Sequence, residues 1–258
     1  MIIFTSVIDF LVVEYMTDTS VLDKLIQIYS IIGFVISLLL VFRTNTAYDR
    51  WWEGRKKWGA YVNDTRNLAT KLASHNLSRE DQDFYKRMIP NFIYASKEHL
   101  RNGVKFEEFN LTEEEKRILE RKGHVPSYMV RMMHERILKA HKNGEISGES
   151  YLAIDKNMNA LLDSLGACER IKNTPIPFSY SLFIKKFIFI YVTTLPLAFV
   201  TTFGYASSLI ATFVFYVLVS MEVLAEEIED PFGVDDNDLP TDELSGKIDK
   251  TVQEIFEA

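Results

Sequence analysis

The sequence predicts an all-α membrane protein, with apolar helices on either side of a highly charged middle. Residues 25–42 form a run of 18 residues without a charged side chain. As a helix this run would rise about 27 Å, enough to cross most of a hydrocarbon core. Five cationic residues follow within the next 15 positions: Arg43, Arg50, Arg55, Lys56 and Lys57. Because Lys and Arg gather on the cytoplasmic side of membranes, the helix is predicted to leave on that side.

Apolar and charged stretches alternate along the chain and predict four segments. Residues 1–42 are expected to form two transmembrane helices, the second over 21–42, although the first is short for a span and is either tilted or lacks its natural N-terminus. Residues 43–177 are typical of amphipathic cytosolic helices. Residues 178–224 are expected to cross the membrane twice more, and residues 225–258 to form an acidic cytosolic tail. Four spans would leave both termini in the cytosol.

Composition and missing motifs exclude several functional classes. The net charge of -7 argues against a nucleic-acid partner, which needs a basic face. A single cysteine, Cys168, rules out an intramolecular disulfide framework. The five histidines form no HExxH or ExxH pair, and no GxSxG, P-loop or GxGxxG motif is present. Nothing in the sequence therefore supports an enzyme.

Local signals predict where the middle helices begin and end. Helix starts are indicated by Ser78 with Asp81, Thr112 with Glu115, and Pro126. The prolines in Thr174–Pro177 should break the preceding helix, expected over residues 151–172. Four leucines of that helix are candidates for burial: Leu152, Leu161, Leu162 and Leu165.

An apolar stripe on the second predicted span is a candidate pore lining. Phe34, Leu38 and Phe42 recur every four residues and should form one ridge on the helix. Gly33 and Ser37 lie on the adjacent stripe, where small residues allow close helix contact. The ridge could form a hydrophobic constriction, or it could consist of ordinary lipid-facing side chains. Periodicity alone favours the second interpretation.

Carboxylates gather at the end of the last predicted span and just after it. Glu222, Glu226 and Glu229 should share one helix face, followed by an oxygen-rich loop at Asp235–Asp238. These acids could bind a cation, or they could pair with arginines and face solvent. Similarly, Arg43 and Arg50 could contact lipid head groups or form structural ion pairs, while Trp51 and Trp52 suit a membrane interface.

Two blocks of sequence resemble the bestrophin family, including its bacterial members. They are Phe42–Arg55 (FRTNTAYDRWWEGR) and Glu226–Gly233 (EEIEDPFG). The resemblance implies a homopentameric channel in a bacterial inner membrane, in contact with the lipid bilayer and small inorganic ions. It also implies that Phe34, Leu38 and Phe42 form an apolar neck around the pore, which reverses the preference drawn from periodicity.

The resemblance also implies a second, cytosolic constriction, for which Ile146 and Leu152 are candidates. Eukaryotic members bind calcium through the acidic loop, so the candidate cation-binding or salt-bridging acids are Glu226, Glu229, Asp230, Asp235 and Asp238. Two departures count against calcium here: Asp230 stands at the family's Asn position, and Val234 replaces the first acid after the glycine. No other cofactor is implied.

The sequence does not decide whether the permeant ion is an anion or a cation. Eukaryotic members conduct chloride and other anions, so the resemblance implies an anion channel. A charge of -7 on each of five copies, about -35 in all, would instead favour monovalent cations such as sodium. A non-conducting membrane scaffold is the alternative of another class.

Overall fold

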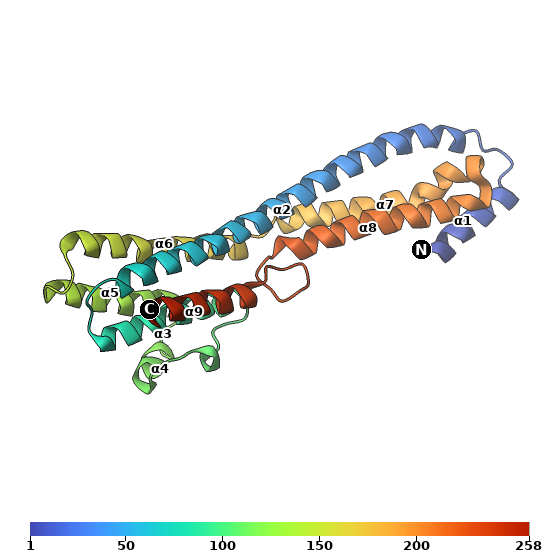
Figure 1. Cartoon of the computed structure of the whole chain (residues 1–258). Helices are drawn as coiled ribbons and strands as arrows, with labels where there is room; N and C mark the ends of the chain where they lie inside the picture. The colour runs from blue at the N-terminus through green and yellow to red at the C-terminus, as the bar shows by residue number, and fades with distance from the viewer. Residues whose placement is uncertain (258) are drawn as a thin grey trace. The chain divides into compact units, whose positions relative to one another are not determined.

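The computed structural model describes residues 1–257, and within them every regular element is helical. The all-α prediction is therefore confirmed. The elements are α1 (Ile2–Tyr15), α2 (Leu22–Ala73), α3 (Arg79–His99), η1 (Phe106–Glu108), α4 (Glu113–Leu119), α5 (Val125–Lys142), α6 (Gly148–Asn173), α7 (Phe178–Phe203), η2 (Gly204–Ala206), α8 (Ser207–Glu229) and α9 (Thr241–Glu257) (Figure 1).

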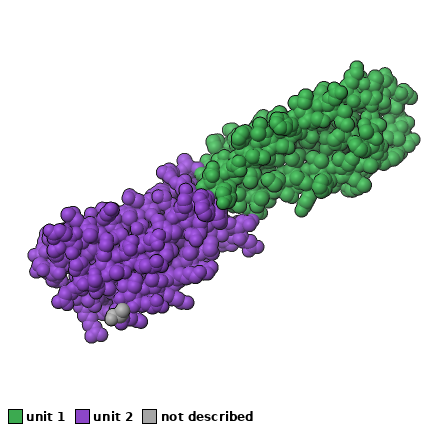
Figure 2. Space-filling model, turned by 45° about the horizontal axis from the view of Figure 1, so that its top comes forward, with its two compact units in different colours: residues 1–50, 175–229 green, residues 51–174, 230–258 purple. Residues whose placement is uncertain are grey.

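The chain divides into two compact units, coloured separately in Figure 2. Unit 1 comprises Met1–Arg50 and Pro175–Glu229. Unit 2 comprises Trp51–Thr174 and the segment from Asp230 to the end of the described chain. Helix α2 contributes its first part to unit 1 and its last part to unit 2.

Unit 1 is a bundle of apolar helices. Helix α7 packs along α8, and α1 contacts both. The first part of α2 joins them through Ile36 and Leu40, which pack against α7 at Ile184, Ile188 and Val192. Within the described chain, two stretches are long and apolar enough to cross a membrane, Leu22–Ala73 and Phe178–Glu229, and the second contains α7 and α8.

Unit 2 has an ordinary hydrophobic core built by helices of mixed charge. Helix α3 packs against α5 and α9, and α5 packs against α6. The last part of α2 inserts Trp58 and Tyr61, both fully buried. Tyr85 is anchored by its hydroxyl, which donates to the carbonyl of Met133 at 2.8 Å. This hydrogen bond ties α3 to α5, whose apolar faces meet in the same core.

The local start and stop signals are confirmed. Thr112 and Glu115 form a complete capping box at α4, because each side chain binds the other's backbone N–H. Ser78 caps α3 through the N–H of Asp81, and Pro126 lies in the first turn of α5. The break between α6 and α7 falls at residues 174–177, as the prolines predict.

Two expectations need correction. Leu161 and Leu165 are buried and Leu162 is half-buried, but Leu152 is 66% exposed. Nine residues separate Leu152 from Leu161, which turns the helix by about 180° and places them on opposite faces. The acidic tail also contains α9, which is not among the expected elements. Its buried residues are Thr241, Ser245, Ile248 and Val252, spaced for one helix face.

Candidate pore helix and acid loop

The predicted neck residues lie on the free face of α2. Phe34, Leu38 and Phe42 are 69%, 43% and 55% exposed in the single chain. Each stands two positions from Ile36 or Leu40, so it points about 160° away from the side that packs on α7. The bundle of unit 1 is thus closed without them, and their side chains are available to lipid or to another copy.

Gly33, the small residue beside this ridge, allows a close contact between two helices of the same chain. A Cβ added at Gly33 would lie 2.7 Å from the hydroxyl oxygen of Tyr191 on α7, closer than real contacts allow. The Tyr191 hydroxyl donates to the carbonyl of Tyr29 at 3.4 Å. Gly33 therefore lets α2 and α7 approach each other. The hydroxyl of Ser37 donates a hydrogen bond within α2, to the carbonyl of Gly33.

Arg43 is a buried structural arginine. Its side chain is 1% exposed, and its Nη2 atom lies 2.7 Å from Glu229 Oε2. The Nε atom is 3.8 Å from Glu222 Oε1. The other Glu229 oxygen accepts the backbone N–H of Ile176 at 2.5 Å. Of the two interpretations of Arg43, the structure supports the ion pair.

The three acids of α8 that were predicted to share a face do not converge on a common point. Glu222 and Glu229 flank Arg43, while Glu226 pairs with Lys185 of α7 at 2.7 Å. Arg50 donates from Nε to the backbone carbonyl of Glu229 at 3.2 Å. Of the alternatives for this helix face, pairing with cationic side chains is the one observed.

Residues 230–240 form the loop after α8, which we name the acid loop. Gly54 of α2 makes room for it: a Cβ there would lie 3.2 Å from the ring of Phe232 and from Pro231. Trp51 fixes its far side by donating from Nε1 to the carbonyl of Asn237 at 3.0 Å. The two sequence blocks that carry the family resemblance therefore meet in unit 2.

Two of the four acids of this loop, Asp230 and Asp238, are engaged through their carboxylates in contacts within the chain. Asp230 pairs with Lys172 at 2.5 Å. Asp238 accepts the backbone N–H of Asp235 at 2.7 Å, and burial together with the charges of Asp235 and Asp230 raises its pKa. Its other oxygen is buried without a hydrogen-bond partner among the described residues.

This donor set does not fit a complete calcium site. Calcium takes six to eight oxygen ligands. In the described part of the loop, Asp238 uses one carboxylate oxygen to accept the backbone N–H of Asp235, and Asp230 is held by Lys172. Glu226 and Glu229 belong to unit 1 and are paired there. We therefore assign no calcium-dependent step to this loop.

The two candidates for a cytosolic constriction differ in burial. Ile146 is 3% exposed and belongs to the core of unit 2. Leu152, on the outer face of α6, is 66% exposed. A residue that lines a passage must present its side chain to that passage, so the burial of Ile146 argues against it and leaves Leu152 as the candidate.

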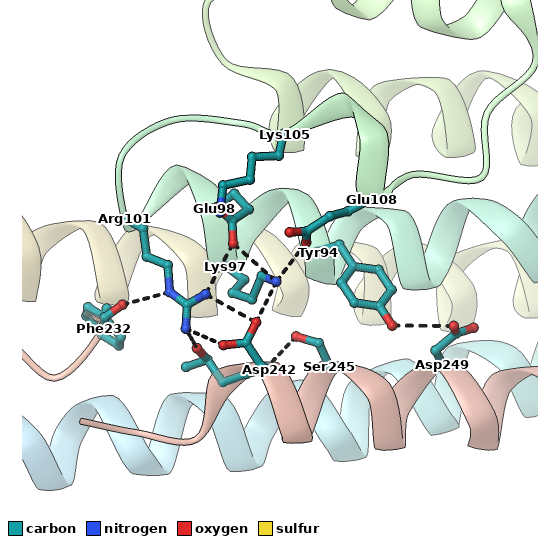
Figure 3. Close-up of polar contacts among 11 residues, drawn as sticks. Tyr94, Lys97, Glu98, Arg101, Lys105, Glu108, Phe232, Asp242, Ser245 and Asp249 are labelled. Carbon is teal, nitrogen blue, oxygen red and sulfur yellow. Dashed lines mark hydrogen bonds and ion pairs between the residues drawn. The ribbon is translucent and has the colours of Figure 1, made fainter. Parts of the chain in front are cut away.

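A charged network joins the C-terminal end of α3 to α9 and was not among the sequence predictions (Figure 3). Lys97 donates to Glu108 and Asp242, both at 2.7 Å. Arg101 donates to Asp242 at 2.7 Å and from Nε to the carbonyl of Phe232 at 3.3 Å. The hydrogen bond from Arg101 is the main reason that the pKa of Asp242 falls to about 2. The network therefore ties the acid loop to α9, and the spacing of Lys97 and Arg101 by one turn was its sequence signal.

One cluster has the residue types of a metal site. Nε2 of His99 and Nε2 of His124 each lie 2.7 Å from Glu169 Oε1. Yet His124 Nδ1 accepts the backbone N–H of Ser127 at 3.3 Å, which puts the imidazole proton on Nε2. A protonated Nε2 donates to Glu169 and has no lone pair for a metal. The geometry therefore indicates a hydrogen-bonded cluster.

Solved structures define the class of this fold. A bacterial bestrophin homologue from Klebsiella pneumoniae matches with a TM-score of 0.90 and 25% identity, over 99% of this chain and 96% of that one. A point variant of that homologue matches with a TM-score of 0.89 over the whole chain. The all-α arrangement is the bestrophin fold.

Sequence comparison identifies the family. The family described as Bacterial/Fungal Bestrophin protein matches residues 1–254. The chain belongs to this family of membrane proteins. A voltage-dependent anion channel-forming protein of Nostoc sp. is 34% identical, over 86% of this chain and 75% of the relative. The like-named protein YneE of Escherichia coli (strain K12) is 30% identical over 86% and 73%. Family and relatives point to an ion channel and not to an enzyme.

Proposed function

We propose that the chain is one subunit of a homopentameric ion channel in the bacterial inner membrane. In this proposal α1, the first part of α2, α7 and α8 cross the membrane over residues 1–42 and 178–224. Residues 43–177 and 225–258 lie in the cytosol, as do both termini, because the number of spans is even. The cationic residues after position 42 support this orientation.

The exposure of Phe34, Leu38 and Phe42 is the observation that carries the proposal. One ridge from each of five copies would close into an apolar ring, and the packed face of α2 would keep each ridge turned inward. Such a ring passes ions only when it is wide enough to stay wetted, so a small change in diameter has a large effect on conduction. Leu152 is the candidate for a second ring in the cytosolic part.

We propose anions, chloride among them, as the permeant ions. The names of the relatives support this choice. A monovalent cation channel is the second candidate, supported by the net charge of -7 per chain. The apolar neck itself carries no fixed charge, so reversal potentials under asymmetric sodium chloride decide between the two.

Recording from purified protein in planar bilayers tests the neck. Replacing Phe34, Leu38 or Phe42 by Ala should widen the ring and raise the conductance severalfold. Phe213→Ala is the matched control, because Phe213 lies on α8 and is equally exposed at 67%. Unchanged conductance in all three neck variants would contradict the assignment, and no ion flux from proteoliposomes would instead favour a membrane scaffold.

A further inference from the structure

A basic groove lies between α9 and the part of α2 in unit 2. It has a volume of about 510 Å³, and its described lining residues include no carboxylate. Arg55 and Arg66 come from α2, and Lys247 and Lys250 from α9. Gly59, Val62, Leu244 and Thr251 complete the lining. In a chain with a net charge of -7, this is a local reversal of sign.

The positive charge of the groove is largely uncompensated. Lys247 pairs with Glu243 at 2.6 Å, one turn away on an exposed face. Among residues 1–257, no carboxylate pairs with Arg55, Arg66 or Lys250. Five other arginines of unit 2 pair with carboxylates: Arg87, Arg101, Arg131, Arg136 and Arg170. Like charges around one concave surface repel each other, and an anion in the groove would remove that repulsion.

The spacing of the cations indicates the shape of the ligand. Arg55 and Arg66 are eleven residues apart, about 16 Å along α2. A single phosphate group is too small to reach both ends of such a wall, whereas a chain of phosphate groups can. Guanidinium forks bind phosphate oxygens in pairs, and lysines on the opposite wall add point charges. We propose that this groove binds the phosphate groups of a small, elongated polyanion that is soluble in water.

Calorimetric titration of the full chain in phosphatidylcholine nanodiscs with tripolyphosphate tests the proposal. Saturable binding is expected, weakening as salt is added. The double variant Arg55→Gln, Arg66→Gln should bind at least tenfold more weakly. The control, Arg79→Gln with Arg121→Gln, removes the same charge from two exposed arginines that have no ion-pair partner among residues 1–257. It should stay within twofold of the unmodified protein. No saturable binding, or an equal loss in both double variants, would overturn the proposal.

Anionic lipid head groups also carry phosphate groups, so a separate experiment must distinguish them from a soluble ligand. Native mass spectrometry after incubation with phosphatidylglycerol counts the lipids that each variant retains. A soluble ligand predicts equal lipid retention in both double variants. Loss of phosphatidylglycerol from Arg55→Gln, Arg66→Gln alone, without tripolyphosphate binding, would make the groove a lipid site and overturn the proposal. The test concerns unit 2 and does not rest on conduction.

Discussion

Arg43 is a buried cationic residue of α2 in unit 1, and acidic residues of α8 pair with it. With a side chain 1% exposed, it depends on Glu229 for its strongest contact. Arg43→Met would leave the buried Glu222 and the half-buried Glu229 without their cation. Breaking a buried pair in this way costs about 3–5 kcal/mol. Thermal unfolding of the detergent-solubilised protein should show a clearly lowered midpoint, whereas the exposed Arg121→Met should leave it unchanged.

The two carboxylates beside Arg43 should differ in importance. Glu229 accepts hydrogen bonds from Arg43 and from the backbone of Ile176, at 2.7 Å and 2.5 Å. Glu222 approaches Arg43 only to 3.8 Å and accepts no hydrogen bond from the described residues. Glu229→Gln should therefore lower the unfolding midpoint more than Glu222→Gln. The reverse order would show that the contacts of Arg43 are assigned wrongly.

Asp242 should make unit 2 sensitive to acid. Its pKa is lowered from 3.8 to about 2, first by the hydrogen bond from Arg101. A carboxyl with a depressed pKa stabilises the fold above its ordinary pKa and loses that contribution as pH falls to the folded value. The stabilisation should therefore disappear between about pH 4 and pH 2. Because the side chain is 64% exposed, solvent screens the effect.

Asp242→Asn is the variant that isolates this contribution. It should unfold more easily than the unmodified chain at pH 7, and the difference between the two should shrink as pH falls from 4 to 2. Unfolding followed by tryptophan fluorescence across this range measures it. A difference that stays constant with pH would mean that the carboxylate charge does not stabilise the network.

Helix α9 depends on tertiary contacts more than on its own sequence. It is 17 residues long, near the length at which isolated helices are marginal, and Ile248 is 2% exposed in the core of unit 2. Ile248→Ala should cost about 2–5 kcal/mol. Hydrogen exchange should then accelerate most in α9 and in the acid loop that the network joins to it. Glu254→Ala, on the exposed face, should leave exchange unchanged.

The elements differ in how far the sequence predicts them, and the reason is the range of the interactions that define them. The capping box of Thr112 and Glu115 and the proline break at residues 174–177 are local, so the sequence alone is sufficient. The burial of Leu152 is predicted wrongly, because the helical pattern does not say which face meets the core. Helix α9 is missed because its apolar positions are few and Asp242 resembles one more solvated acid.

The same distinction holds for the candidate site. Sequence could place the apolar ridge of Phe34, Leu38 and Phe42, since the spacing of residues along a helix fixes it. It could not choose between head-group contact and an ion pair for Arg43, because Glu229 lies 186 residues away along the chain. The basic groove likewise brings together residues of α2 and α9, which are far apart along the chain. Long-range pairing is what the structure adds.

At the scale of the whole molecule, the proposed assembly requires five Leu38 side chains to face one passage. Leu38→Cys would place five thiols there. A positively charged methanethiosulfonate reagent should then abolish most of the current in a planar bilayer. The native Cys168 should not interfere, since it is buried and its pKa is raised to about 12, chiefly by burial. Phe213→Cys controls for modification outside the ring and should leave the current unchanged. If Leu38→Cys is modified to completion, as mass spectrometry would verify, and the current persists, then this face of α2 does not line the passage.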